Sequence, residues 1–432
     1  MISRQQLSRT IGLFKADLQI PDEVVIHRRL TGLRVALVAG DEVMRTRAGQ
    51  VAILTSALLL ARSGHKVFIH VFDVPLIGHQ PPFGGETVFG AVEQLRGQLI
   101  DGSDISIGFP RHAAIAFEFG SRSSIAPFCA PRTVSVGWSA WAGEIVDWPE
   151  RALRTEDNWP MGAMAAAVLV ASEAIKFVGH SLASLSGSPT HIRELFGSSR
   201  SAFLRLAPKD TPQIATLGEF DVISAGAVSN ALVYALMRLP DVVGNARVFD
   251  GDVSDKSNLN RNMLLTMELL HLSKVDLLAQ FSRGIKVNPI ARHFNRGDLH
   301  KLVARVAVGV DDIPTRWLLA EAGADWMGIG ATSHFSSMSS VHFPNSACAA
   351  CLHPHDERIE GPIPTIAFVS FLSGLMAAAN LVIDIPRSPV FPASQQRYLT
   401  SLHVENDYGD FSSPVAPRAD CPARCPASRQ CR

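Results

Sequence analysis

The sequence lacks a net charge, a long uninterrupted apolar run and a recognisable leader, and each absence argues against a class of protein. Its 432 residues include 40 basic and 40 acidic ones, so the bulk charge gives no support for binding nucleic acid or an acidic membrane. No uninterrupted apolar run reaches the roughly 18–20 residues that cross a bilayer. Residues 1–6 lack the basic and apolar regions of a signal peptide. We therefore expect a cytoplasmic enzyme with no membrane or nucleic-acid partner.

Cysteine is also scarce, and its few copies are unevenly placed. The six cysteines are Cys129, Cys348, Cys351, Cys421, Cys425 and Cys431. In a reducing compartment, clustered cysteines bind metal more often than they form disulfides. The spacing of Cys348 and Cys351 is usual for a zinc knuckle. We expect Cys421 and Cys425 to complete the site, although three residues separate them.

Other ligands remain open at this stage, because Cys431 could replace either member of the second pair and His353 or His355 could enter the site. A tetrathiolate site leaves no position for water and is therefore structural. The sequence predicts a bound Zn²⁺ that clamps the C-terminal tail. Many prolines and alanines in residues 412–432 suggest that the tail has little order without the metal.

A chain of this length fits two domains, and the two halves follow one plan. Each begins with a strand, a helix and a second strand that ends in an acidic residue. In the first half these are residues 33–38, 51–61 and 66–72 with Asp73; in the second they are 220–224, 227–238 and 246–249 with Asp250. Such a unit opens a doubly wound, nucleotide-binding sheet.

The correspondence continues towards the end of each half. We pair the apolar runs 104–109 and 305–310, then 133–138 and 325–330, and finally the long small-residue helices 161–178 and 366–383. Two Rossmann-like domains that arose by duplication are the favoured interpretation, with two unrelated α/β domains as the alternative. The predicted α/β domains are residues 1–210, degenerate and inactive, and residues 211–432, which carry the chemistry and the tail.

Polar residues that suit a nucleotide gather only in the second half. The turn at residues 224–230 lies between strand and helix, where the backbone amides around Gly226 and Ala227 can face a phosphate. Asp250 can accept hydrogen bonds from ribose hydroxyls. These features would suit NAD as well as ATP, so residues further along the chain must discriminate.

The discriminating residues favour a triphosphate. Arg261 can bind phosphate oxygens with two donors, and Lys274, thirteen residues later, can act as a point charge. Asp311 follows a strand and can hold Mg²⁺ against the phosphates, with Asp252 in support. Asn258 completes the set. Alone, each residue is an ordinary surface group; in this order they indicate ATP.

The same residues resemble a known family. The turn at 224–230, Asp250-Gly-Asp252, Ser257-Asn-Leu-Asn-Arg261 with Lys274, residues 311–316, and Cys348-Ala-Ala-Cys351 are similar to motifs of the ubiquitin-activating-enzyme superfamily. The resemblance covers about residues 218–425 and, weakly, residues 30–205. The chain as a whole resembles bacterial activating enzymes in which an inactive and an active adenylation domain are fused into an intramolecular pseudo-dimer.

That resemblance implies a function. The second half would bind Mg-ATP and the C-terminal tail of a small ubiquitin-like or sulfur-carrier protein, and would adenylate its carboxylate. Asp250 would hold ribose; Asn258, Arg261 and Lys274 would hold phosphates; Asp311 would hold Mg²⁺. The family often adds an arginine from the partner domain, for which Arg28 and Arg29 are among several candidates.

Related enzymes that form a thioester use a cysteine in the segment after the zinc knuckle, yet residues 352–365 contain none. Cys129 and Cys431 are the only spare cysteines, so we expect the adenylate to pass to the thiol of a conjugating or sulfur-transfer partner. Alternatives are activation or leader binding of a ribosomal peptide, a non-catalytic scaffold of the same fold, and an NAD oxidoreductase, against which the basic pair argues.

Overall fold

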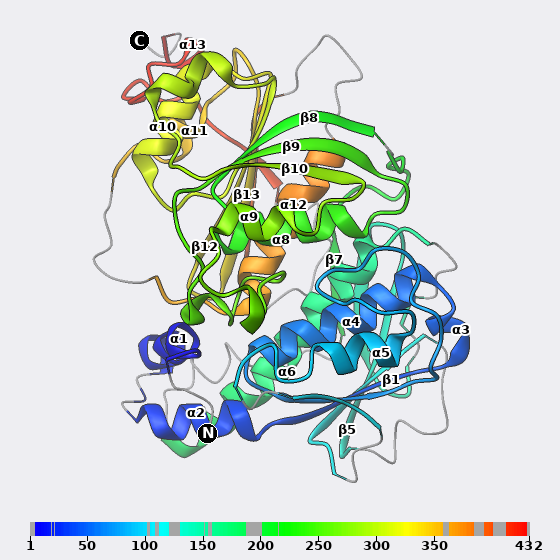
Figure 1. The fold of residues 1–432 in the computed structure, drawn as a ribbon. Coiled ribbons are helices and arrows are strands. Elements are labelled where there is room, and N and C mark those ends of the chain that lie inside the picture. The colour runs from blue at the N-terminus through cyan, green and yellow to red at the C-terminus, as the bar shows by residue number, and fades with distance from the viewer. Residues whose placement is uncertain are drawn as a thin grey trace.

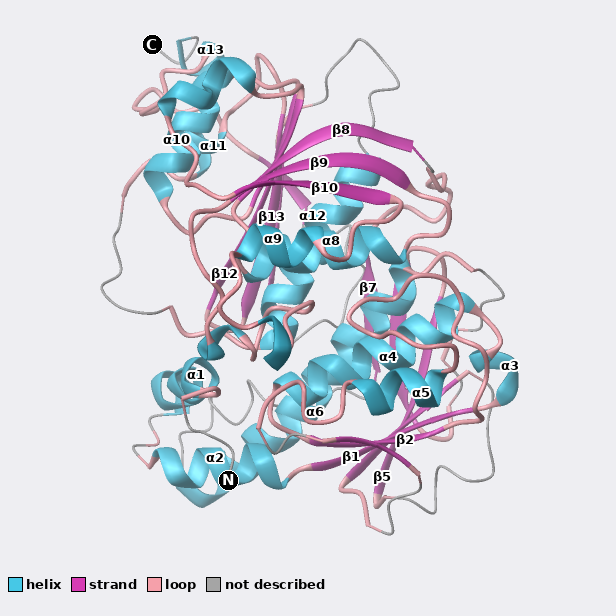
Figure 2. Cartoon of the chain, viewed as in Figure 1, coloured by secondary structure: helices cyan, strands magenta, loops and turns pink. Residues whose placement is uncertain are grey.

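The computed structural model describes most of the chain. The described residues are 5–18, 20, 22–101, 104–108, 112–120, 130–150, 152–153, 158–186, 201–214, 216–356, 363–383, 393–400 and 412–429. Figure 1 shows two lobes, one coloured blue to cyan and the other green to red, with long helices between them. The two lobes correspond to two sheets, each formed by a continuous part of the sequence (Figure 2).

The first sheet has seven strands in the order β3-β2-β1-β4-β5-β6-β7. They are β1 Arg34–Ala39, β2 Lys66–His70, β3 Ile105–Ile107, β4 Ile115–Phe119, β5 Arg132–Trp138, β6 Ala142–Asp147 and β7 Ser201–Arg205. The pairs from β3 to β5 are parallel, whereas β6 is antiparallel to both of its neighbours. β1 is buried and apolar after Arg34, and β4 is buried throughout with Glu118 as its one charged residue, so both are mainly apolar, as central parallel strands require.

The second sheet has eight strands in the order β10-β9-β8-β11-β12-β13-β14-β15. They are β8 Thr216–Ile223, β9 Val243–Phe249, β10 Ile285–Ile290, β11 Arg305–Val308, β12 Trp326–Ser333, β13 Ser336–His342, β14 Gln395–Thr400 and β15 Ser412–Pro414. Its first seven strands repeat the order and the directions of the first sheet. The predicted α/β class with two Rossmann-like units is therefore confirmed, and β15 is added at the edge.

The repeat corrects one strand assignment. We expected residues 104–109 to be the counterpart of residues 305–310. The strand β3 in fact lies at the edge of the first sheet, where β10 lies in the second, and the counterpart of β11 is β4. The sequence argument failed because an apolar run of this length shows that a strand exists, whereas its position depends on long-range pairing.

The helices cover the sheets and join the two lobes. They are α1 Ser8–Leu18, α2 Glu23–Gly32, α3 Asp41–Met44, α4 Arg47–Arg62, α5 Val88–Gln94, α6 Met161–Ser186, α8 Ala227–Arg238, α9 Lys274–Ala279, α10 Ile313–Ala322, α11 Ala349–Leu352, α12 Ala367–Ile383 and α13 Pro426–Arg429, with short 3₁₀ helices η2 Lys256–Asn258, η3 Met267–Leu269 and η4 Arg296–Lys301. Of these, α1 and α2 precede the first strand.

Four of these helices form the contact between the lobes. α4 packs on α6 and α8 packs on α12, and the two pairs meet through α6 and α12. The hydroxyl groups of Thr55 on α4 and Tyr234 on α8 lie 2.9 Å apart in a buried hydrogen bond. Tyr234 also makes an edge-to-face contact with Phe371 of α12. Equivalent helices therefore meet around an approximate two-fold relationship, as expected for an intramolecular pseudo-dimer.

By length and composition, α6 could span a membrane, but 94% of its most apolar window is buried inside the protein. Glu173 and Lys176 interrupt its apolar surface and pair with each other, and Glu173 also pairs with Arg132. A fully buried helix is apolar on all sides because it touches protein all round. The position of α6 between the two sheets accounts for its composition.

Gly374 on α12 allows a close approach to α8. A Cβ atom at Gly374 would lie 2.3 Å from the Val228 carbonyl oxygen and 2.6 Å from the Ala231 Cβ atom. We expect Gly374→Ala to lower the free energy of unfolding by about 1–3 kcal/mol, because the two helices must move apart. Urea unfolding measures the change.

Gly12 on α1 provides the matched control, because a Cβ atom there would meet no heavy atom within 4 Å. Gly12→Ala should stabilise the protein by about 0.5–1 kcal/mol through helix propensity. Equal effects of the two substitutions would contradict close packing at Gly374.

Candidate nucleotide site and zinc site

The turn between β8 and α8 is shaped by two hydrogen bonds. Ser224 has a φ of +88°, a conformation that favours glycine, and its hydroxyl oxygen accepts the Gly226 amide at 2.9 Å. The Ala225 amide donates to Asp250 Oδ2 at 2.7 Å. Gly226 is the N-cap of α8 and Ala227 is its first residue. The turn thus presents a helix N-terminus at the carboxyl edge of the sheet, the usual place for a ligand in such folds.

Asp250, which directly follows β9, is buried and joins the turn to the next loop. Its Oδ1 atom accepts the Asp252 amide at 2.8 Å, while Oδ2 holds Ala225. Each carboxylate oxygen can accept a further hydrogen bond. Asp252 and Lys274 form an ion pair of 2.6 Å, and the hydrogen bond from Lys274 lowers the pKa of Asp252. The ion pair thus holds Lys274, the first residue of α9, close to Asp250, the residue predicted to bind ribose.

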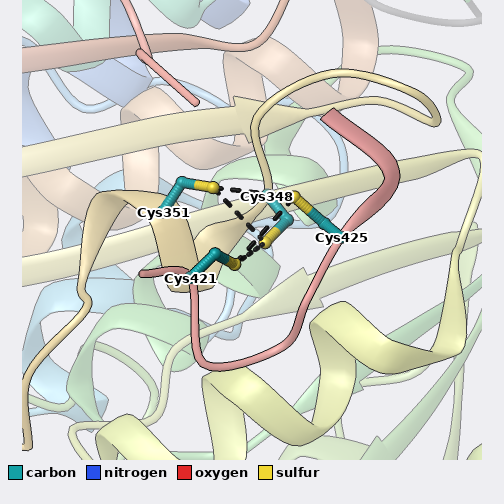
Figure 3. Close-up of side chains that lie close together, drawn as sticks. All are labelled: Cys348, Cys351, Cys421 and Cys425. Atoms are coloured by element: carbon teal, nitrogen blue, oxygen red, sulfur yellow. Dashed lines mark hydrogen bonds between the residues drawn. The ribbon is translucent and has the colours of Figure 1, made fainter. Parts of the chain in front are cut away.

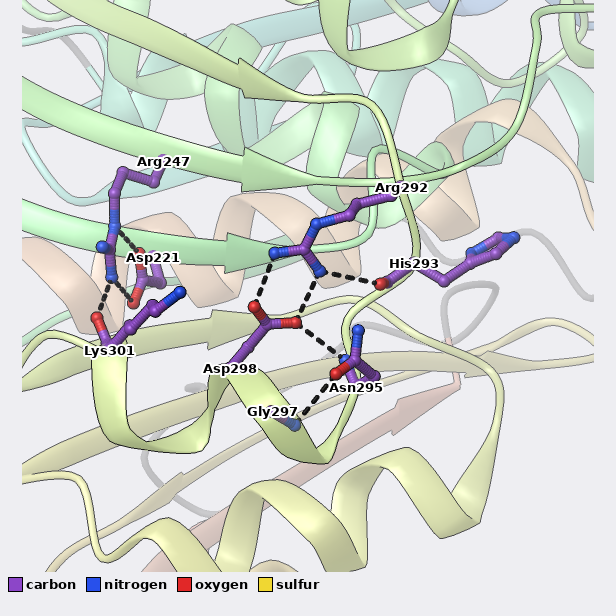
Figure 4. A network of polar contacts seen from close by, with 8 residues as sticks. All are labelled: Asp221, Arg247, Arg292, His293, Asn295, Gly297, Asp298 and Lys301. Carbon is purple, nitrogen blue, oxygen red and sulfur yellow. Dashed lines mark hydrogen bonds and ion pairs between the residues drawn. The ribbon is translucent and has the colours of Figure 1, made fainter.

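His293 also reaches this loop, although no sequence motif marks it. Its Nε2 atom lies 3.7 Å from Asp252 Oδ1, and its ring lies against Gly251, where a Cβ atom would approach within 2.8 Å. The neighbouring Arg292 is held by two hydrogen bonds of 2.6 Å to the Asp298 carboxylate. Figure 4 shows this network and the separate pair between Arg247 and Asp221.

The segment that begins with η2 carries the predicted phosphate ligands. Asn258 Oδ1 accepts the Asp255 amide at 3.0 Å and closes a capping box. Arg261 donates from Nη1 to the Ser257 carbonyl and, at 2.9 Å, to Asn260 Oδ1. Burial lowers the pKa of Arg261 to about 10. The guanidinium remains charged at neutral pH and is held within its own loop.

Asp311 lies exposed, three residues after β11, beside several guanidinium groups. Its charge raises the pKa of Arg9, Arg261 and Arg316, opposing the larger lowering that burial causes at each. Arg316 donates to the Val310 carbonyl and supports the start of α10. The structure therefore brings Asp311 and Arg261 together, although fifty residues separate them.

Arg9 is the arginine of the first half that reaches this cluster. It lies on α1 and donates from Nη1 to the Ile363 carbonyl at 2.9 Å. The next residue, Thr10, is 3.4 Å from the Asn260 side-chain amide. Arg28 and Arg29, which we considered from the sequence, instead lie exposed on α2. No local motif marks Arg9, because its proximity arises from docking of α1 on the second half.

The equivalent positions of the first half are used differently. The Asp73 carboxylate accepts the Phe89 amide at 3.0 Å and thereby supports the start of α5. The short helix α3 occupies part of the connection between β1 and α4, where the second half has only its turn. The Asp73 carboxylate thus has a structural partner in its own half.

Four cysteines converge at the end of the chain (Figure 3). Their sulfur atoms are separated by 3.5 Å for Cys348 and Cys421, 3.6 Å for Cys351 and Cys425, 3.9 Å for Cys421 and Cys425, and 4.0 Å for Cys348 and Cys351. Tetrahedral Zn²⁺ with bonds of about 2.3 Å requires sulfur separations of about 3.8 Å. The four thiols fit a structural zinc site.

The neighbouring thiols shift one another's pKa values, because two thiolates in contact repel each other, and a bound dication would offset that repulsion. Hydrogen bonding to Cys351 raises the pKa of Cys348, and the same contact lowers the pKa of Cys351 to about 5. Among the described residues, the cluster contains these four cysteines and neither His353 nor His355. Cys129 and Cys431 lie outside the described residues. The predicted ligand set is thus brought together.

Comparisons with known proteins agree with this architecture. The profile of the family described as the BilD N-terminal domain matches residues 34–187. The SAMP-activating enzyme E1 of Haloferax volcanii is 28% identical over 172 residues, which are 37% of this chain and 62% of that protein. The chain is thus a distant relative of an E1-like activating enzyme, as its motifs led us to expect.

Two solved structures are also similar to parts of the chain. E. coli MccB bound to ATP is 12% identical, with 67% of this chain and 97% of that chain covered and a TM-score of 0.38. PaaA is 12% identical, with 46% and 64% covered and a TM-score of 0.34. Such low TM-scores carry no argument about function. The chain spans less than two thirds of the length of the Haloferax volcanii enzyme.

Proposed function

We propose that this protein uses ATP to adenylate the C-terminal carboxylate of a small ubiquitin-like or sulfur-carrier protein. The observation that carries the proposal is the joined turn and loop at the carboxyl edge of the second sheet, where the Asp250 carboxylate accepts the Ala225 and Asp252 amides and Lys274 pairs with Asp252. The charge of Asp311 acts on Arg261 and Arg9, and together these residues would provide groups for ribose, phosphates and a metal ion. The similarity to an E1-like activating enzyme supports the same reaction class.

In the proposed reaction, a carboxylate oxygen of the substrate attacks the α-phosphorus of ATP. A new P–O bond forms, the bond to the β-phosphate oxygen breaks, and pyrophosphate leaves with the electron pair. Two anions must approach each other, so catalysis depends on orientation and charge neutralisation. Asp250 would accept hydrogen bonds from the ribose, and the N-terminus of α8 at Gly226 and Ala227 would face a phosphate.

The remaining groups would act on the phosphates. Arg261 and Asn258 would bind charged phosphate oxygens of ATP, and Arg9 would add a second guanidinium from the first half. Lys274 would leave or share its ion pair with Asp252 to neutralise the departing pyrophosphate. Mg²⁺, held by Asp311 with Asp252 in support, would supply positive charge to the phosphate oxygens.

The fold of the first half bears on the choice of substrate. A module that binds the leader of a ribosomal peptide would be small and winged-helix-like. Residues 34–205 instead form a seven-stranded sheet that repeats the second one. This observation favours the pseudo-dimer and a folded protein substrate over activation of a ribosomal peptide.

The proposal is tested by ATP–pyrophosphate exchange with candidate ubiquitin-like proteins, each supplied with a free or an amidated C-terminus. We expect exchange only with the free carboxylate, because an amide cannot attack the α-phosphorus. The products should contain no reducible enzyme conjugate, since the adenylate passes to a partner's thiol.

Two results would contradict these expectations. Absence of both exchange and ATP binding would favour a scaffold of the same fold. A conjugate lost on replacement of Cys129 or Cys431 would show that the enzyme forms its own thioester.

A further inference from the structure

Each half contributes a fully buried arginine that donates hydrogen bonds to the backbone of the other half. Arg62 ends α4 and Arg238 ends α8, which are equivalent helices of the repeat. Both side chains are fully buried. Arg238 donates to the Pro81 carbonyl of the first half at 2.5 Å and to Tyr234 in its own helix at 3.2 Å. The two arginines are therefore matched in position and burial but differ in what they hold.

Arg62 holds the backbone of the second half at three points. Nη1 donates to the Leu259 carbonyl at 2.5 Å, and Nη2 donates to the carbonyls of Met263 at 3.0 Å and Leu265 at 2.7 Å. The planar guanidinium has donors in a fixed fork, so it can orient several carbonyls at once. The three acceptors are thereby kept at set positions relative to α4.

The segment held by Arg62 is the one that carries the proposed phosphate ligands. Asn258 directly precedes Leu259, and Arg261 lies between the anchored carbonyls. The second half supplies its own anchor through Asn230, whose Oδ1 atom accepts the Leu264 amide at 2.9 Å. The side chains of residues 259, 263, 264 and 265 are fully buried. The position of this loop is thus set jointly by α8 of its own half and α4 of the other half.

We propose that Arg62 is a positioning residue for the nucleotide site, through which the first half sets the ATP affinity of the second. The inference rests on the proposed ATP-binding function. Without the guanidinium, three buried carbonyl groups lose their donor, and the loop must rearrange to find others. Asn258 and Arg261 would then lose their fixed placement against Asp311. Arg62 would thus affect ATP binding without itself touching ATP.

The test compares the wild-type full chain with Arg62→Lys, Arg62→Met and Arg238→Met. Calorimetry measures Mg-ATP binding, thermal unfolding measures stability, and hydrogen–deuterium exchange reports on residues 256–266. We expect both Arg62 variants to weaken Mg-ATP binding by roughly tenfold or more. Exchange should accelerate in that segment. Arg238→Met should lower the unfolding midpoint while its ATP affinity stays close to that of the wild type.

The outcomes separate the inference from the function on which it rests. If the wild type does not bind Mg-ATP, the proposed function fails. If it binds, but the Arg62 and Arg238 variants lose affinity equally, Arg62 has only a structural role. Unchanged affinity and exchange in Arg62→Lys and Arg62→Met would also overturn the inference. Arg62→Lys keeps a buried cation and three donors, so it provides the comparison if Arg62→Met does not fold.

Discussion

Asp311→Asn should reduce ATP–pyrophosphate exchange by about 10²–10³-fold, the usual effect of removing one group that stabilises charge in a transition state. The substitution removes the carboxylate proposed to hold Mg²⁺ and leaves Arg9, Arg261 and Arg316 without their shared counter-charge. Exchange rates with a saturating protein substrate measure the effect. Stability should change by at most about 1 kcal/mol, because Asp311 is exposed.

The neighbouring Asp312 provides a control of the same chemistry. Its carboxylate is used as the N-cap of α10 and accepts the Thr315 amide at 2.7 Å. Asparagine caps a helix about as well as aspartate, so Asp312→Asn should leave exchange within about twofold of the wild type. If the two variants lost exchange activity equally, Asp311 would have no special role, and the loss would come from the removal of one negative charge from this region.

Replacement of Cys348 or Cys425 by serine should release zinc and unfold the C-terminal clamp. The four sulfur atoms connect α11 with the tail that contains α13, and a structural zinc site contributes directly to folding. We expect one zinc ion per wild-type chain, loss of that ion in each variant, and a decrease in stability of about 4 kcal/mol or more. Metal analysis and urea unfolding measure these effects.

The remaining cysteines give the matched controls. Cys129→Ser and Cys431→Ser should retain the full zinc content, because the four-cysteine cluster needs neither. Zinc loss in Cys431→Ser would show that this residue belongs to the ligand set, an alternative that the sequence left open. Chelation of wild-type protein should accelerate proteolysis of residues 412–429, whereas the first sheet should stay resistant. Equal cleavage with and without chelator would contradict a zinc clamp.

The proposed difference in role between the two halves rests on small differences within a shared strand order. Both sheets have the same strand order, and each contributes a helix that ends in a buried arginine. In each half an aspartate follows the second strand. In the first half it is Asp73, which supports the start of α5, and in the second half it is Asp250, which supports the turn before α8. A duplicated fold can thus keep one site and use the other half for support.

The sequence determined those features that depend on local pattern. Apolar runs located β1, β8 and the helices α8 and α12, because burial of a strand or helix face leaves a periodic signal. Spacing within one loop indicated the group from Asp250 to Lys274. The cysteine spacing identified the knuckle at Cys348 and its partners at Cys421 and Cys425. These inferences needed neighbours in the chain or a strongly constrained chemistry.

Only the tertiary structure decided what comes from distant segments. No local sequence pattern indicates that β3 lies at the edge of its sheet or that Arg9 lies near Asp311. The same is true of the contact between His293 and Asp252 and of the hydrogen bonds from Arg62 to residues 259–265. A side chain on one helix does not reveal which carbonyl groups a second domain will bring to it. The contacts of Arg9 and Arg62 are set by how the two halves dock, because docking buries apolar faces without regard to distance along the chain. The place of β3 and the contact of His293 are set by the long-range folding of a single half.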